Sequence, residues 1–238
     1  MARSIYIASP NAGTGKSTVA LGLVSCLTKV VAKVGVFRPF VESREGDAFL
    51  SLLLNRAGST TPAEQCVGAT WDEFHADPEE ALARIVDAYR ALAREHDVVI
   101  IDGSDFTDVA GNPELALNAR VAANIGVPVL LVVSGQNDVE DVVASVEVSM
   151  AEIADNHART VAVVANKCLP ETRQAVGEAL TAIEGITSTT LPEVPLLAAP
   201  VVREVLDAVE GTLIAGDETL LDREAESVLV CAMDVSHV

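Results

Sequence analysis

A glycine-rich segment near the N-terminus carries the residues best suited to chemistry, Ser9-Pro-Asn-Ala-Gly-Thr-Gly-Lys-Ser17. It lies between a short apolar run and a helical pattern, and it is close to the phosphate-binding pattern G-x-x-x-x-G-K-[ST]. In that pattern glycines let backbone N–H groups face phosphate oxygens, the lysine reaches the β- and γ-phosphates, and the hydroxyl binds Mg²⁺. The residues in place are Gly13, Gly15, Lys16 and Ser17. Pro10 stands where the first glycine would be. The segment predicts a loop that binds ATP and magnesium, with an accidental glycine-rich turn as the alternative.

Two aspartates are candidates for a metal site beside this loop. Asp102 ends the apolar run from Val98 to Ile101, where proteins with such a loop place a second magnesium carboxylate, usually through water. A turn or helix-cap aspartate is the alternative for this residue. Asp47 lies in Gly46-Asp47-Ala48 at a predicted helix start. The pattern alone indicates only a structural N-cap there.

Polar residues close to two other apolar runs are candidates for nucleotide contacts. Asn166 and Lys167 follow the run from Val161 to Ala165, and an amide offers both a donor and an acceptor to a base. Chance polar turn residues are the alternative. Arg38, before Pro39, is predicted to end the second strand and to place a fixed positive charge at the same sheet edge. A surface ion pair would explain this arginine equally well.

Short apolar runs alternate with longer helical patterns, and this alternation predicts βαβ units around a buried parallel sheet. The predicted strands are Ser4 to Ala8, Val34 to Phe37, Val98 to Ile101, Val129 to Val133 and Val161 to Ala165. The predicted helices are Thr18 to Val30, Pro78 to Arg94, Pro113 to Ile125, Val139 to Ile153 and Glu171 to Ile183. Because such crossovers are nearly always right-handed, we expect an α/β fold of the P-loop class, with a doubly wound, mostly parallel sheet and helices on both faces.

Two segments depart from this alternation. Glu42 to Asp77 is richer in Gly, Ser, Thr and Pro and contains the only tryptophan, so we interpret it as an excursion from the sheet that carries ligand contacts. Near the C-terminus, Ser227 to Ala232 reads as a strand with little chain after it. We therefore predict a nucleotide-binding domain over residues 1–215, and a linker with the start of a following, truncated domain over residues 216–238.

Composition restricts the partners. The 35 Asp and Glu against 16 Lys and Arg give a net charge of -19, which opposes binding to nucleic acid and to anionic membranes. No apolar run approaches the ~20 residues that span a bilayer, and no signal pattern begins the chain. The four cysteines have no paired spacing, which favours a reducing cytoplasm. The four histidines show no ligand spacing, and we interpret them as surface residues.

Six motifs follow one another along the chain: the glycine-rich loop, Phe37-Arg38-Pro39, Gly46-Asp47-Ala48, Asp102-Gly103, Val164-Ala165-Asn166 and Glu193-Val194-Pro195. In this order the chain resembles the dethiobiotin synthetase-like P-loop family up to about Leu206. The resemblance implies that Lys16 contacts phosphates, that Ser17, Asp47 and Asp102 hold Mg²⁺, that Asn166 contacts adenine, and that Glu193 to Pro195 lines the base. The nucleotide-binding set that it implies is Gly13, Thr14, Gly15, Lys16, Ser17, Thr18, Arg38, Asn166 and Pro195. It assigns no catalytic residue.

Two departures separate the chain from the synthetase itself. Arg38-Pro39 replaces a Lys-Pro, and Asp102-Gly103-Ser104-Asp105-Phe106 replaces a Glu-Gly-Ala-Gly-Gly turn. The chain is more similar to the N-terminal domain of long bacterial phosphate acetyltransferases, with Leu220 to Val238 as the entry into their middle domain. This resemblance implies a regulatory, assembly-forming domain in a homo-oligomer, whose partners are a nucleotide and the downstream domains of the same enzyme.

Two other functions stay open at this stage. An autonomous ATP-dependent ligase, such as a dethiobiotin synthetase or a cobyrinic acid amide synthase, is the main alternative. Its substrate side would involve Arg38 and residues Ser104 to Phe106. A partition or septum-site ATPase is disfavoured, because those proteins carry a lysine where this loop has Asn11.

Overall fold

A computed structural model describes residues 2–104, 114–197, 199–225 and 227 of the chain. Contacts divide the chain into two compact units, Met1–Pro192 and Glu193–Val238. The predicted boundary after residue 215 falls within the second unit and stays a prediction. In the described residues, no helix is long and apolar enough to cross a membrane.

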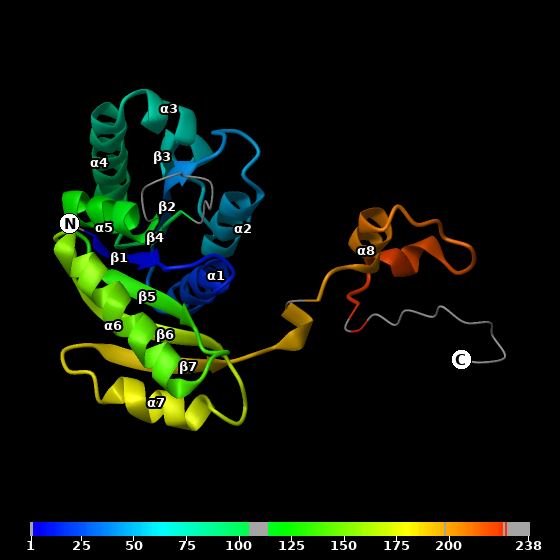
Figure 1. Ribbon diagram of the computed structural model, residues 1–238. Coiled ribbons are helices and arrows are strands. Elements are labelled where there is room, and N and C mark those ends of the chain that lie inside the picture. Colours follow the sequence, from blue (N-terminus) through cyan, green and yellow to red (C-terminus); the bar gives the residue numbers. More distant parts are fainter. Residues whose placement is uncertain (1, 105–113, 198, 226, 228–238) are drawn as a thin grey trace. The chain divides into compact units, whose positions relative to one another are not determined.

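The first unit is built on one parallel sheet (Figure 1). Its seven strands lie in the order β3-β2-β4-β1-β5-β6-β7, and every neighbouring pair is parallel. Their bounds are β1 Arg3–Ala8, β2 Val34–Val41, β3 Val67–Thr70, β4 Val98–Asp102, β5 Val129–Ser134, β6 Thr160–Cys168 and β7 Thr187–Pro192. The predicted doubly wound α/β fold is thereby confirmed.

Helices cover both faces of this sheet (Figure 1). On one face α4 (Pro78–Glu95), α5 (Glu114–Ile125), α6 (Val139–Asp155) and α7 (Arg173–Thr181) pack one beside the next. On the other face α1 (Lys16–Leu27) packs against α2 (Ala48–Ala57). The central strands β4 and β5 are apolar up to their last residue, Asp102 or Ser134, because both of their faces are buried.

Local signals fix several helix starts. Asp77 accepts hydrogen bonds from the backbone N–H groups of Glu79 and Glu80, and Pro78 occupies the first position of α4, where a missing N–H costs nothing. The short helix α3 (Trp71–Ala76) begins with a reciprocal cap between Thr70 and Glu73. Each of these starts follows a polar residue just before a helical pattern.

Residues 42–77 are only in part an excursion from the sheet. They contain α2, the 3₁₀ turn Ala63–Cys66 and α3, but also β3, which returns to the sheet beside β2. This strand was not predicted because it has only four residues, one of them Gly68. The polar edge strand β7 was missed as well, since its alternation of threonine and serine buries little apolar surface.

Strand β2 is longer than predicted, so Arg38 and Pro39 lie inside it and not at its end. The strand pairs with β4 only over Val34 to Phe37, and beyond that point its partner is β3. Arg38 and Phe40 are in register with residues of β3, whereas Pro39 falls between them. A proline without an N–H donor is tolerated there because β4 no longer pairs with this part of the strand.

The second unit contains the 3₁₀ turn Pro195–Leu197, the helix α8 (Val202–Ala208) and the 3₁₀ turn Glu218–Asp222. An antiparallel bridge joins Val201 to Glu224, and Arg203 pairs with Asp222 at 2.9 Å between Nε and Oδ1. The strand predicted over Ser227 to Ala232 lies outside the described residues, apart from Ser227.

Candidate phosphate-binding site

The segment Ser9–Ser17, here called the phosphate loop, joins β1 to α1 at the C-terminal edge of the sheet. Gly13 and Gly15 have φ values of 75° and 80°, in the left-handed region that favours glycine. Gly15 is the N-cap of α1 and, as a glycine, has no side chain with which to cap this helix start. The first N–H groups of α1 are therefore the kind of donors that bind an anion.

The phosphate loop is held in shape from β6. Asn166 donates from Nδ2 to the carbonyl oxygen of Thr14 at 2.9 Å, and Lys167 donates from Nζ to that of Gly13 at 2.8 Å. A Cβ atom on Gly15 would collide with the Asn166 amide, so the two residues fit only because Gly15 has no side chain. Both contacts use loop carbonyls, which leaves the loop amides to other partners.

These contacts of Asn166 and Lys167 with the phosphate loop, here called the clamp from β6, correct one prediction and leave another open. Asn166 and Lys167 lie within β6 and do not follow it, because the strand continues to Cys168 through an irregular register at the positive φ of Lys167, 59°. The contacts of these two residues with the loop were not foreseen. The contact of Asn166 with adenine stays a prediction.

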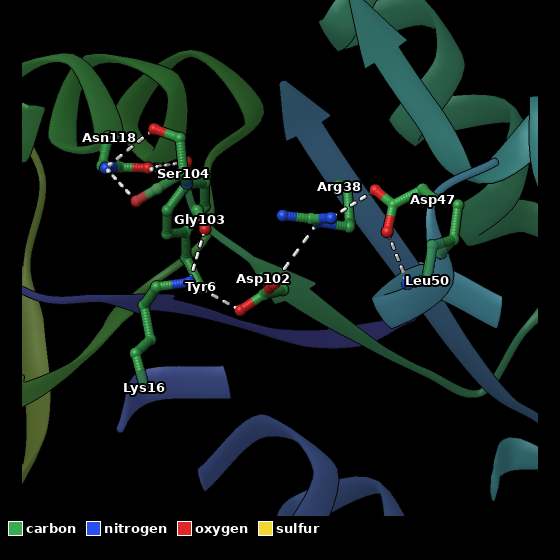
Figure 2. A network of polar contacts seen from close by, with 9 residues as sticks. All are labelled: Tyr6, Lys16, Arg38, Asp47, Leu50, Asp102, Gly103, Ser104 and Asn118. Carbon is green, nitrogen blue, oxygen red and sulfur yellow. Dashed lines mark hydrogen bonds and ion pairs between the residues drawn. The ribbon is translucent and has the colours of Figure 1, made fainter. Parts of the chain in front are cut away.

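Lys16 points across the sheet edge to the end of β4 (Figure 2). Its Nζ lies 2.7 Å from Oδ1 of Asp102 and 2.5 Å from the carbonyl oxygen of Gly103. Both side chains are buried, with 1% of the Lys16 side chain and none of that of Asp102 exposed. The structure thus brings together the loop lysine and the strand-end aspartate that the sequence singled out.

Arg38 lies between the two predicted metal carboxylates (Figure 2). Its Nη1 forms an ion pair with Oδ2 of Asp47, and its Nε lies 3.4 Å from Oδ2 of Asp102. The guanidinium also lies over the ring of Phe49, 5.8 Å from its centroid. The arginine is therefore part of a buried charge network and not of a surface ion pair.

Asp47 serves first as a helix cap. Its Oδ1 accepts a hydrogen bond from the backbone N–H of Leu50 at 2.8 Å, at the start of α2. The structural role indicated by the pattern is confirmed. Gly46, just before it, has a φ of 80° and turns the chain into this cap. A depression of about 270 Å³ lies next to it, lined by Arg38, Glu42, Ser43, Glu45, Gly46 and Asp47.

A second buried network fixes the backbone of Gly103 and Ser104, which directly follows Asp102. Oδ1 of Asn118 accepts hydrogen bonds from the Tyr6 hydroxyl at 2.7 Å and from the backbone N–H of Ser104 at 3.0 Å (Figure 2). A Cβ atom on Gly103 would lie 2.7 Å from the carbonyl oxygen of Ile7 and 2.5 Å from Asn118 Oδ1. This packing holds the Gly103 carbonyl where Lys16 reaches it.

Burial in this network also shifts the pKa of the Tyr6 hydroxyl. Loss of solvation raises the pKa of its hydroxyl well above the ordinary value of 10.0, and the carboxylates of Asp102 and Glu114 raise it further. Asn118 and Tyr6 were not predicted as site residues. The available signal was a polar side chain within the apolar stretch Leu115-Ala-Leu-Asn118-Ala119, where a buried amide requires partners.

The site fits phosphate better than it fits magnesium. Phosphate would find a lysine, an arginine and the amides of a glycine turn at a helix start. Magnesium was predicted at Ser17, Asp47 and Asp102, but both carboxylates already contact cationic side chains of the chain. Throughout the described part of the chain, no group of three or more His, Cys, Asp or Glu side chains could hold a metal ion.

The remaining predicted residues lie in two places. Thr14 is buried within the phosphate loop, while Ser17 is half-buried and Thr18 exposed in the first turn of α1. Pro195 belongs to the second unit, so its place beside the base stays a prediction. Asp105 and Phe106, part of the predicted substrate side, lie outside the described residues.

The chain is similar in sequence to known proteins of two kinds. The chain is 24% identical over 249 residues to a phosphate acetyltransferase of Synechocystis sp., which it matches along its whole length while spanning 36% of that protein. It is 28% identical over 201 residues to a hydrogenobyrinate a,c-diamide synthase of Streptomyces coelicolor, with 83% of this chain and 37% of that protein covered. The resemblance to phosphate acetyltransferases indicated by the motifs is thereby confirmed.

Among solved structures, a plasmid partition protein of Borrelia burgdorferi bound to AMPPNP aligns with a TM-score of 0.57. The alignment covers 93% of this chain and 94% of the other, at 14% identity, and shows a shared fold alone. The family assignment rests on a sequence profile, that of the AAA domain family AAA_26, which matches residues 3–205. This match includes the phosphate loop, Asp102, Asn166 and nearly the whole first unit. The chain therefore belongs to the AAA domain family.

Proposed function

We propose that this chain is the nucleotide-binding, regulatory N-terminal domain of a phosphate acetyltransferase, and that it binds ATP without transferring acetyl groups itself. The observation that carries the proposal is the phosphate loop, with two left-handed glycines, a buried lysine and a clamp from β6. The relatives support the parent activity, which is the exchange of acetyl between coenzyme A and phosphate. This chain spans 36% of such a relative, and the remainder would carry that reaction.

Local geometry has to supply the affinity for a nucleotide. The net charge of -19 repels a polyphosphate at long range, so binding depends on the loop amides, on the buried Lys16 and on the partly buried Arg38. Charge-assisted hydrogen bonds from these groups are stronger than neutral ones. Pro10 removes one backbone donor at the position of the first glycine, and we therefore expect a modest affinity.

Calorimetry with ATP tests the nucleotide part of the proposal. Lys16→Ala should abolish binding, whereas Lys29→Ala, which removes an exposed lysine just after α1, should leave it intact. Because Lys16→Ala leaves Asp102 buried without its lysine, circular dichroism must show that the variant is folded. Absence of ATP binding by the wild type, or equal binding by the Lys16 variant, would refute the claim.

Regulation requires the complete enzyme. If ATP occupancy changes how this domain interacts with the rest, the coupling should be about 1 to 3 kcal/mol, which gives a several-fold change in acetyl transfer. Lys16→Ala should reduce the response to ATP while basal turnover stays the same. The regulatory role is wrong if removal of residues 1–238 alters neither the rate, the response to ATP nor the oligomeric state.

An autonomous ATP-dependent ligase is the second candidate, favoured by the similarity to a hydrogenobyrinate a,c-diamide synthase. The Arg38 network weighs against the dethiobiotin version of this function, because the guanidinium is engaged by two carboxylates and is bulkier than a lysine. We expect no dethiobiotin from diaminopelargonate, carbon dioxide and ATP. Product above a control without enzyme would promote the ligase over the regulatory domain.

A further inference from the structure

The charges around Arg38 balance one another. Two cations, Lys16 and Arg38, face two carboxylates, Asp47 and Asp102 (Figure 2). These residues come from the start of α1, the interior of β2, the start of α2 and the end of β4. Their side chains are between 0% and 15% exposed. Among the described residues, these four charges cancel at a site largely removed from solvent.

Three of the four carboxylate oxygens accept hydrogen bonds within the chain. The fourth, Oδ2 of Asp102, accepts no hydrogen bond from the described residues and has an ion-pair contact with Arg38 instead. Oδ1 of Asp102 contacts Lys16 at 2.7 Å, and its Oδ2 faces Nε of Arg38 at 3.4 Å. Oδ1 of Asp47 accepts the N–H of Leu50 at 2.8 Å, and its Oδ2 pairs with Nη1 of Arg38. A magnesium ion needs such oxygens as ligands, in near-octahedral geometry.

Arg38 cannot make way for a metal by losing its charge, since a guanidinium stays protonated in proteins. A divalent cation placed between Asp47 and Asp102 would thus add two positive charges beside a fixed one. It would also have to displace a side chain that lies over the Phe49 ring, pairs with Asp47 through Nη1 and faces Asp102 through Nε. Both effects oppose metal binding at this position.

We propose that Arg38 takes the place of the divalent cation, so that this site binds nucleotide phosphates without metal. The inference rests on the proposed nucleotide binding. The planar guanidinium offers five N–H donors, more than its contacts to the two aspartates use, and it is suited to phosphate oxygens. Lys16 and Arg38 would then be the two cations that face the phosphates, where a metal and a lysine would otherwise do so.

The first experiment is calorimetric titration of the wild-type chain with ATP, once in EDTA and once in excess MgCl₂. Metal-independent binding predicts dissociation constants that agree within about threefold, well below the factor of ten that corresponds to one strong contact. An affinity that falls about tenfold or more in EDTA overturns the proposal. This comparison needs no variant and so does not depend on how a substitution folds.

The second experiment follows Mn²⁺ binding by electron paramagnetic resonance, without nucleotide. The wild type and Arg84→Met, which removes an exposed arginine paired with Glu73 and Glu80, should bind no Mn²⁺ at this site. Arg38→Met, with the same loss of charge, should gain a site, because Asp47 and Asp102 lose their shared cation. Asp47→Asn in that background should remove the gain while keeping the cap of α2, since asparagine is as good an N-cap.

The two experiments separate the inference from the function beneath it. If ATP binds in neither buffer, the proposed nucleotide binding fails, and the Mn²⁺ comparison alone decides the role of Arg38. Binding of Mn²⁺ by the wild type, with no increase in Arg38→Met, shows that the arginine does not take the place of a metal. Arg38→Lys keeps one charge but cannot bridge both carboxylates, and should give an intermediate gain in Mn²⁺ binding.

Discussion

Removal of the Asn118 side chain should destabilise the first unit far more than its single position suggests. Asn118 is fully buried in α5, and its Oδ1 is the acceptor for both the Tyr6 hydroxyl and the backbone N–H of Ser104. In Asn118→Ala both donors stay buried and lose this acceptor. Each unsatisfied group costs ~1 to 3 kcal/mol, so we expect a loss of about 3 to 5 kcal/mol in the free energy of unfolding.

The matched substitutions should cost much less. In Tyr6→Phe the Ser104 amide keeps its acceptor, so the loss should be about 1 kcal/mol. Asn124→Ala lies on the same helix and also removes an amide that donates to a carbonyl four residues earlier, but at an exposed position. It should change the free energy of unfolding by less than about 0.5 kcal/mol.

Urea denaturation of the wild type, the two single variants Tyr6→Phe and Asn118→Ala, and the double variant measures these values and their coupling. Once Tyr6 is replaced by Phe, Asn118→Ala removes the acceptor of one donor instead of two, so the coupling energy should be about 1 to 2 kcal/mol. The same variant should weaken ATP binding, because Asn118 fixes the backbone next to the carbonyl that Lys16 contacts. Equal losses for Asn118→Ala and Asn124→Ala, or additive effects of the Tyr6 and Asn118 changes, would show that this network does not act as described.

Three further predictions concern single features. Gly15→Ala should abolish ATP binding in calorimetry, because the new Cβ atom sits at a positive φ and collides with Asn166. The control Gly22→Ala, in open space on α1, should bind ATP normally and raise the free energy of unfolding by up to about 1 kcal/mol. Above pH 10.0 the unfolded chain loses the Tyr6 proton that the folded protein keeps, so the free energy of unfolding should fall with rising pH. In Tyr6→Phe, denaturation at several pH values should show this fall reduced by up to ~1.4 kcal/mol per pH unit. Burial raises the pKa of the Cys66 thiol to about 11, whereas Cys26 is exposed. Peptide mapping after brief alkylation should therefore find Cys26 labelled at least about tenfold faster than Cys66, and equal labelling would contradict the buried position of Cys66.

The fold was readable from the sequence because the central strands are buried on both faces and must be continuously apolar. β1, β4 and β5 were predicted with bounds that differ by at most one residue at either end. The edge strand β7 carries no such requirement, and its polar sequence resembles a loop. The edge strand β3 is buried, but its four residues with one glycine are too few to be recognised as a strand. Strand ends were also misplaced where polar residues continue a strand, as at Arg38 in β2 and Asn166 in β6.

Lys16, Arg38, Asp47, Asp102 and Asn166 of the candidate site were singled out from the sequence, but their pairings were not. A motif indicates which side chains gather at the sheet edge, as for Lys16 and Asp102, because parallel strands end there together. It does not state which cation faces which carboxylate, since that depends on side-chain directions set by packing. The bridge from Arg38 to both aspartates and the loop contacts of Asn166 therefore required coordinates.

The ion pair between Lys16 and Asp102 has a consequence for how the site responds to concentration. An anion that binds the lysine ammonium must first displace a carboxylate that is covalently part of the chain, so Asp102 acts as a tethered competitor present at high effective concentration. The apparent affinity for the anion is lowered by the fraction of time in which the lysine is released. A receptor built in this way saturates late, and it would follow changes in an abundant ligand instead of staying permanently occupied.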